Sequence, residues 1–173
     1  MRLFRSRSTS PSFGADRAYA QEVSAPPGGY APAAPMTGLA LTPSDQSAFE
    51  RLLGELQDAF GHEDYARLRA ITTPEVMSYL AEELSDNATH GRRNEVTGTR
   101  LLDGEISEAW QEDGQDYATV AMHYESVDVM RDRATGAVLA GSTHEPTMTT
   151  ELWTFVRPSG SWGSWKVSAI QEA

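Results

Sequence analysis

Cysteine is absent from this chain of 173 residues. Without thiols there is no disulfide framework, no thiolate nucleophile and no Cys-ligated zinc or iron–sulfur centre. Long hydrophobic runs are also missing, since no apolar stretch approaches the ~18–20 residues of a membrane-spanning helix. No P-loop, Rossmann turn or G-x-S-x-G pattern occurs, so we expect no catalytic residues and no cofactor. The histidines lack metal-ligand spacing, and we expect no metal site at any of them: His62, His90, His123 and His144.

The net charge of −11 is distributed unevenly along the chain. Residues 1–36 carry four arginines against two acids, so residues 37–173 hold a net charge of −13. The first segment is also rich in proline, glycine and alanine, a composition that buries too little apolar area to fold. We expect residues 1–40 to be a disordered linker with a basic N-terminus and residues 41–173 to be one folded domain. The acidity of that domain argues against nucleic-acid binding.

Helical signals dominate the first part of the expected domain. Thr42 reads as an N-cap, and the proline after it suits the first helical position. An apolar stripe at helical spacing then continues towards Gly61. Asp64 is placed to cap a short second helix, and Thr73 opens a third that ends by Gly91. The sequence therefore predicts three consecutive helices.

A two-residue periodicity replaces the helical one after the third helix. Residues 96–102 and 106–111 are expected to form two short strands, followed by a type I′ hairpin turn at Asp113-Gly114. The next strand alternates until its apolar residues change parity, which predicts a β-bulge near Glu125 or Ser126.

The chain ends in a hairpin that is rich in tryptophan. Residues 148–156 alternate, and the runs 151–157 and 162–170 flank a turn that contains proline and glycine. Helices followed by an antiparallel meander define the α+β class, with the N-terminal helices packed on one face of a curved antiparallel sheet.

Four segments, taken together, resemble one known family. They are LTPSDQSAFERLLGELQDAF, EDYARLRAITTPEVMSYLAEEL, SEAWQEDGQDYATVAM and TELWTFVRPSGSWGSWKVSAIQ. Their order is similar to that of the nuclear transport factor two-like cone. More closely, residues 41–173 resemble the C-terminal domain of the forty-four-kilodalton subunit of the mitochondrial inner-membrane translocase.

This resemblance implies an interaction role rather than catalysis. The mitochondrial relative is a peripheral inner-membrane scaffold that tethers a chaperone motor to the import channel, and its domain contacts lipid. We therefore expect a membrane-associated adaptor with a protein partner of the translocase, chaperone or ribosome-like class. Bacterial relatives commonly carry a membrane helix upstream. The resemblance thus implies either a fragment or a shortened gene model of a bacterial inner-membrane protein, with its domain on the cytoplasmic side or, alternatively, in the periplasm.

Three groups of residues are candidates for functional contacts. Arg2, Arg5 and Arg7 would flank the membrane helix and bind an anionic leaflet, unless they form a solvated tail. Arg92 and Arg93, expected in the loop after the third helix, would contact an acidic partner. Four aromatic residues would either line a ligand-accepting cone or pack as ordinary core: Trp110, Tyr124, Trp153 and Trp165.

Two other functions stay open for the same cone. A small apolar ligand or acyl chain would need an open cavity without ionisable groups. An isomerase or dehydratase would need a deep cavity with a buried carboxylate of raised pKa, and Tyr124 with Asp128 is the acid–hydroxyl pair that a long strand offers. The acidic pairs Glu82-Glu83 and Glu112-Asp113 read as solvated faces or turns. The sequence does not indicate an oligomeric state.

Overall fold

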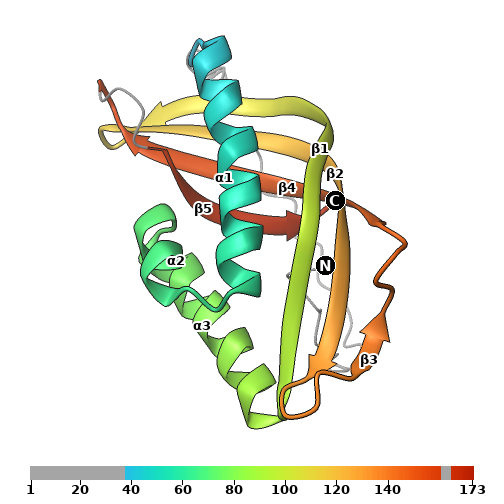
Figure 1. Ribbon diagram of the computed structural model, residues 1–173. Coiled ribbons are helices and arrows are strands. Elements are labelled where there is room, and N and C mark those ends of the chain that lie inside the picture. The colour runs from blue at the N-terminus through green and yellow to red at the C-terminus, as the bar shows by residue number, and fades with distance from the viewer. Residues whose placement is uncertain (1–37, 161–164) are drawn as a thin grey trace, which may run out of the picture.

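A computed structural model of the protein describes residues 38–160 and 165–173 (Figure 1). The helices come first: α1 (Pro43–Gly61), α2 (Tyr65–Ile71) and α3 (Pro74–Thr89). The strands follow: β1 (Arg92–Glu112), β2 (Gln115–Asp132), β3 (Val138–Gly141), β4 (Thr147–Pro158) and β5 (Lys166–Glu172). Within these residues the sheet order is β1-β2-β4-β5, and β3 pairs with β2 beyond the end of β4. The named strands pair antiparallel, which confirms the predicted α+β class with helices packed on a curved sheet.

The starts of α1 and α2 are fixed by side-chain caps at the predicted positions. The Thr42 hydroxyl accepts a hydrogen bond from the Asp45 amide at 3.2 Å, and the Asp45 carboxylate accepts one from the Thr42 amide at 2.8 Å. The Asp64 carboxylate accepts from the Arg67 amide at 2.9 Å and so caps α2. Thr73 precedes α3 without a side-chain cap, and the proline after it supplies the helical φ.

The two short strands expected over residues 96–102 and 106–111 are one continuous strand, β1, of 21 residues. The prediction was wrong because β1 has three irregularities at which it carries an extra residue relative to β2. They lie between Thr97 and Arg100, between Leu101 and Asp103, and between Ile106 and Glu108. Each extra residue interrupts the alternation that identifies a strand in sequence. Bulges also bend a strand, and β1 curves strongly together with β2 (Figure 1).

The change of parity in β2 lies close to the predicted place. Buried residues alternate as far as Ser126, and the pattern shifts before Val129. The extra residue belongs to β1, because Thr97 and Arg100 pair with the two residues that flank Ser126. The bulge predicted near Glu125 or Ser126 therefore lies on the neighbouring strand, opposite these residues.

The connections between strands follow the turn chemistry of the sequence. Asp113 and Gly114 have positive φ angles of 49° and 73°, as a type I′ turn requires. After β2 the Asp132 carboxylate accepts a hydrogen bond from the Thr135 amide at 2.8 Å. The chain then returns as β3, a strand that the sequence pattern does not predict. Strands β4 and β5 pair as predicted, and Trp162 lies outside the described residues.

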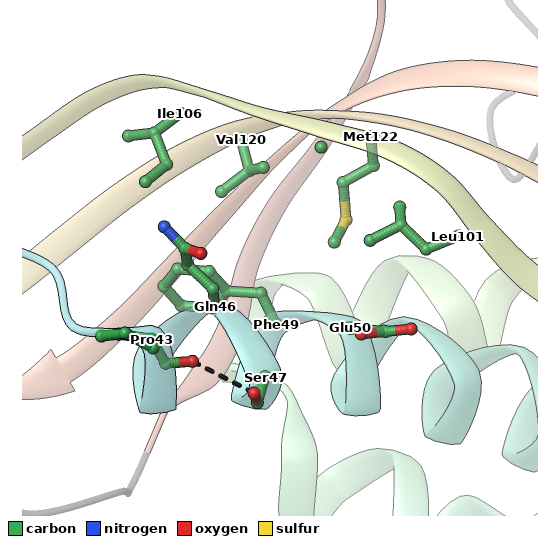
Figure 2. Close-up of a pocket in the computed structure, with 10 residues that line it drawn as sticks. Pro43, Gln46, Ser47, Phe49, Glu50, Leu101, Ile106, Val120 and Met122 are labelled. Carbon is green, nitrogen blue, oxygen red and sulfur yellow. Dashed lines mark hydrogen bonds between the residues drawn. The ribbon is translucent and has the colours of Figure 1, made fainter.

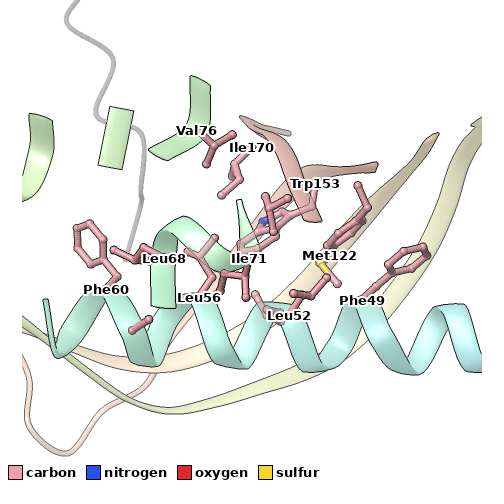
Figure 3. Close-up of a cluster of buried hydrophobic side chains, with 14 of the residues drawn as sticks. Phe49, Leu52, Leu56, Phe60, Leu68, Ile71, Val76, Met122, Trp153 and Ile170 are labelled. Carbon is pink, nitrogen blue, oxygen red and sulfur yellow. The ribbon is translucent and has the colours of Figure 1, made fainter. Parts of the chain in front are cut away.

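The hydrophobic core lies between the helices and the concave face of the sheet (Figure 3). From α1 the predicted stripe contributes Leu56 and Phe60, which are fully buried. Leu68 of α2 and Trp153 of β4 face this stripe and are also fully buried. Burying a side chain of this size contributes about 1.5–3 kcal/mol to the stability of the folded state. The stripe therefore holds α1 against the sheet.

A buried ionic cluster joins the first turn of α1 to the end of the sheet. Arg157 of β4 donates to Asp45 at 2.7 Å and to Asp116 of β2 at 3.0 Å. Trp165 donates its indole N–H to Asp45 at 2.9 Å, and the Arg157 guanidinium lies 4.3 Å from the Trp165 ring centroid. Burial acts to raise the pKa of Asp45 and Asp116, but hydrogen bonds and the Arg157 charge outweigh it and lower both pKa values. Asp45 thus caps the helix and also anchors it.

Candidate binding site

A groove of about 330 Å³ opens between the first half of α1 and the bent part of β1 and β2 (Figure 2). Its apolar lining comes from three elements: Phe49 of α1, Leu101 and Ile106 of β1, and Val120 and Met122 of β2. In Figure 2 the strand side chains point towards the helix, and Gln46 and Phe49 point back towards the strands. The groove therefore has an apolar floor that faces one end of a helix.

The groove exists because β1 is irregular where it passes α1. Two of its bulges lie here, directly after Leu101 and directly after Ile106. Gly104, between them, has no side chain to fill the space, and a Cβ atom there would lie 3.6 Å from Leu101 Cδ2, an ordinary contact distance. Ile106 is 37% exposed, although it pairs with the buried Val120 and so shares its face of the sheet. Apolar surface is thus left open to solvent.

The surroundings of the groove are strongly negative. Gln46, Ser47 and Glu50 are exposed on its α1 side, and no ion pair joins Glu50 to another described residue. Residues 101–122 include six acidic and no basic side chains. Three of these acids are exposed on the outer face of β1, alternating with the residues that line the groove: Asp103, Glu105 and Glu108. A cation that approached the groove would therefore be attracted from both sides of this edge strand.

A buried hydrogen-bonded cluster lies deeper on the concave face. The Tyr124 hydroxyl donates to Oε2 of Glu151 at 2.8 Å, and the Trp153 indole N–H donates to the same oxygen at 2.9 Å. Gln57 of α1 donates from Nε2 to the Tyr124 oxygen at 3.2 Å. The side-chain oxygen of Gln57 and Oε1 of Glu151 have no hydrogen-bond partner among the described residues, and these side chains are 0% and 1% exposed.

Burial raises the pKa of the acidic groups in this interior. It raises the pKa of Glu151 despite the hydrogen bonds that the carboxylate accepts, and it raises the pKa of Tyr124 as well. Burial followed by the charges of Asp128 and Asp86 raises the pKa of Glu83 to about 7. The expectation that Glu83 is merely solvated is wrong, because α3 leaves it partly buried. Neither Glu83 nor Glu151 lines the groove.

The four aromatic residues predicted for the cone occupy different places. Trp110 stacks on Tyr117 with ring centroids 5.0 Å apart, on the outer face of β1 and β2. The other three are buried in the core: Tyr124, Trp153 and Trp165. None of the four lines the groove. The acid that accepts a hydrogen bond from Tyr124 is Glu151 of β4, in place of the Asp128 considered from the sequence.

Arg92 and Arg93 begin β1 and do not lie in a loop. Arg92 donates to Asp86 at 3.3 Å, and Arg93 donates to the carbonyl oxygen of Gly61 at 3.2 Å, near the end of α1. Arg93 also lines a second cavity of about 390 Å³, together with Glu95, Arg131 and Arg133. Both arginines therefore make contacts within the domain. The predicted membrane-flanking residues lie outside the described part of the chain: Arg2, Arg5 and Arg7.

The groove residues of β1 were missed from the sequence. The available signal was Gly104, an isolated glycine between two apparent strands, because such a glycine indicates a bulge or an open space beside the backbone. Phe49 and Met122 were recognised as parts of apolar patterns, but nothing local distinguishes a groove-lining residue from a core residue.

The described residues contain no helix with the length and apolarity to cross a membrane. They also contain no group of three or more histidine or carboxylate side chains arranged to hold a metal ion. Three helices pack against a curved, open antiparallel sheet, as predicted. The sequence model of the family described as "Tim44-like domain" matches residues 46–172. The chain belongs to this family, which confirms the resemblance noted from the sequence.

Three solved structures that match this chain over 75% of its length have little sequence in common with it. The intermembrane space region of chloroplast protein ARC6 is 11% identical, with a TM-score of 0.48 over 75% of this chain and 95% of that one. A conserved protein from Planctomyces limnophilus DSM 3776 is 13% identical, with a TM-score of 0.37 over 75% and 98% of the two chains. A nuclear transport factor 2-like superfamily protein from Salmonella enterica serovar Typhimurium LT2 is 10% identical, with a TM-score of 0.39 over 75% and 90%. A comparison with curated proteins found no match.

Proposed function

We propose that this domain is a non-catalytic adaptor at a bacterial inner membrane, with a role in protein translocation or assembly. The observation that carries the proposal is membership of the Tim44-like domain family over residues 46–172, because this family is membrane-associated. The groove beside α1 supports an interaction role, since open apolar surface bordered by polar side chains is typical of a docking site.

The absence of catalysis is part of this proposal. A general acid or base must lie within hydrogen-bond reach of its substrate. The carboxylates whose pKa is raised, Glu83 and Glu151, are not among the residues that line the groove. An enzymatic activity of the purified chain that Glu83→Gln or Glu151→Gln abolished without unfolding it would contradict this part.

The proposed location is the cytoplasmic side of the membrane. Arg2, Arg5 and Arg7 would then flank a membrane segment on the side where basic residues accumulate. The alternative is a periplasmic domain. A reporter fused to the C-terminus, active only in the cytoplasm or only in the periplasm, separates the two placements.

Affinity capture with chemical crosslinking tests the adaptor role. The native gene product, tagged at its C-terminus, is crosslinked in cells and purified from the membrane fraction. We expect a defined inner-membrane protein complex to come down with it. Recovery in the soluble fraction without any membrane complex would refute the proposal.

Binding of a small apolar ligand is the second candidate function. It is favoured by the lining of the groove, in which the one ionisable side chain, Glu50, is exposed at the rim. Native mass spectrometry of the purified chain tests it. A lipid or other apolar molecule that co-purifies at a fixed ratio would support it, and a ligand-free chain would not.

A further inference from the structure

We propose that the groove beside α1 binds a basic amphipathic segment of a partner protein. Apolar side chains of that segment would enter the groove, and its lysine or arginine side chains would lie against the acidic residues around it. This inference rests on the proposed adaptor function, and it names the docking site and the chemistry of the partner.

The size and lining of the groove suit a few inserted side chains. Its volume of about 330 Å³ lies at the lower end of the range of roughly 300–1,000 Å³ that ligand pockets occupy. Leu101, which is half-buried, and Ile106, which is 37% exposed, supply the accessible apolar surface, and Met122 lies almost fully buried beneath them. Phe49 is held by stacking on Phe155, with ring centroids 4.3 Å apart, so one wall of the groove is rigid.

Charge decides the chemistry of the occupant. On the outer face of β1, Asp103, Glu105 and Glu108 are exposed, and the α1 side of the groove adds Glu50. Asp116, another acid of this stretch, is neutralised by Arg157. An acidic segment would be repelled here, and an uncharged one would gain nothing from this field. A segment with lysine or arginine beside its apolar residues matches both the apolar lining of the groove and the negative charge around it.

Four acids near the groove have no arginine partner within the described residues. Elsewhere Glu55 pairs with Arg67, and Glu95 pairs with Arg131 at 2.9 Å. Further pairs of this kind are Glu63 with Arg133, Asp86 with Arg92, and Glu125 with Arg100. In contrast, no ion pair within the described chain involves Glu50, Asp103, Glu105 or Glu108. Their charge is available to a cation from outside.

The test uses two fluorescently labelled synthetic peptides and the whole 173-residue chain. Both peptides have the same leucine pattern at helical spacing; one carries lysine and the other glutamate at every polar position. Fluorescence anisotropy measures binding at low and at high salt. We expect the lysine peptide to bind at least tenfold more tightly than the glutamate peptide, and this preference to shrink as salt screens the charges.

Two pairs of variants locate the binding site. Gly104→Leu places a side chain in the groove, and Gly54→Leu adds the same side chain where no atom lies within 4 Å of the new Cβ. Glu50→Lys reverses the charge at the rim, and Glu82→Lys makes the same change on the exposed face of α3. We expect Gly104→Leu and Glu50→Lys each to lower the affinity for the lysine peptide at least tenfold. The two control variants should keep an affinity within about twofold of the wild-type value.

Several outcomes would overturn the inference. Equal binding of both peptides would exclude charge recognition, and unchanged binding by Gly104→Leu would exclude the groove. If the chain alone dimerises and Gly104→Leu abolishes the dimer, the occupant is a second copy. The adaptor function is judged separately: a membrane complex captured equally by wild type and Gly104→Leu would leave that function standing and refute only this site.

Discussion

Replacing Glu151 by glutamine is expected to stabilise the domain at high pH and to have little effect in acid. Burial raises the pKa of Glu151 above its ordinary value of 4.5 in the folded chain. The folded state therefore keeps this proton over a pH range in which the unfolded chain has released it. Because the folded state then binds more protons, the free energy of unfolding falls as pH rises from 4.5 through the folded-state pKa. Glutamine does not titrate and removes this decline.

The size of the effect follows from the contacts of the carboxylate. One oxygen accepts hydrogen bonds from Tyr124 at 2.8 Å and from Trp153 at 2.9 Å, while the other has no partner. A buried polar atom without a partner costs about 1–3 kcal/mol. Glutamine retains the accepting oxygen and replaces the partnerless oxygen, which is charged at high pH, by a neutral amide group. We expect Glu151→Gln to be about 1–3 kcal/mol more stable than the wild type near pH 8.

Urea unfolding followed by tryptophan fluorescence, repeated over a series of pH values, measures this difference. Glu145→Gln, in an exposed loop, controls for the loss of one negative charge. Glu151→Leu adds a second comparison, because it leaves the Tyr124 hydroxyl and the Trp153 indole without an acceptor. It should cost about 2–6 kcal/mol in acid, since each stranded donor costs about 1–3 kcal/mol. The cost should shrink at high pH, where the wild type loses stability through the ionisation of Glu151. Stability curves of wild type and Glu151→Gln that run parallel across the whole pH range would refute the reasoning.

Three further predictions concern other parts of the fold. The pKa values of Asp45 and Asp116 are lowered in the folded state, so their stabilising effect is present above the ordinary value of 3.8 and is lost as pH falls through the folded-state values. Acid titrations of unfolding should show this loss in the wild type and a smaller one in Asp45→Asn. Glu83→Gln should remove a decline in stability between pH 4.5 and about 7, because the pKa of Glu83 is raised over that range, and a variant with an unchanged decline would contradict this. Gly141→Ala should lower the melting temperature more than Gly136→Ala, because the new Cβ would lie 2.2 Å from the Asp128 carbonyl oxygen at one site and contact nothing within 4 Å at the other. Equal losses would show that the positive φ alone sets the cost.

The helices and tight turns could be predicted from the sequence because their determinants are local. Thr42, Asp64 and Asp113-Gly114 each act on backbone groups within three residues, and each does so in the structure. The class of fold follows from the order of these elements. Recognition of the family rested on the same order, extended over most of the domain.

The length of β1 and the groove beside it could not be predicted in this way. The bulges of β1 are defined only by its pairing with β2, and in the sequence they appear as ends of strands. Gly104 therefore looked like a break, although it lies within a continuous strand and opens a space beside α1. The groove is formed where a side chain is absent, between elements that are distant in sequence. Neither the helical nor the strand periodicity of the sequence indicates such a site.

Asp45 illustrates the same limit for charged residues. From the sequence it is an acid in the first turn of a helix, which is a sufficient local explanation. In the structure it also accepts hydrogen bonds from Arg157 and Trp165, which follow it by 112 and 120 residues. No spacing rule connects such positions, so the anchoring of α1 was invisible before the fold was known.

This anchoring has a consequence for the groove, because the turn that Arg157 holds through Asp45 also carries Gln46 and Ser47 of the α1 wall. Arg157→Lys keeps one positive charge but loses the planar group that donates to two carboxylates at once. We expect the amides of the first turn of α1 to exchange with solvent at least tenfold faster in this variant, while those near Gly61 keep their rates. Arg133→Lys, which weakens the ion pair to Glu63 at the other end of α1, should show the opposite distribution. An equal rise in exchange rate along the whole of α1 in both variants would contradict this prediction. It would mean that the two ion pairs stabilise the whole domain, and that the Arg157–Asp45 pair does not specifically fix the α1 wall of the groove.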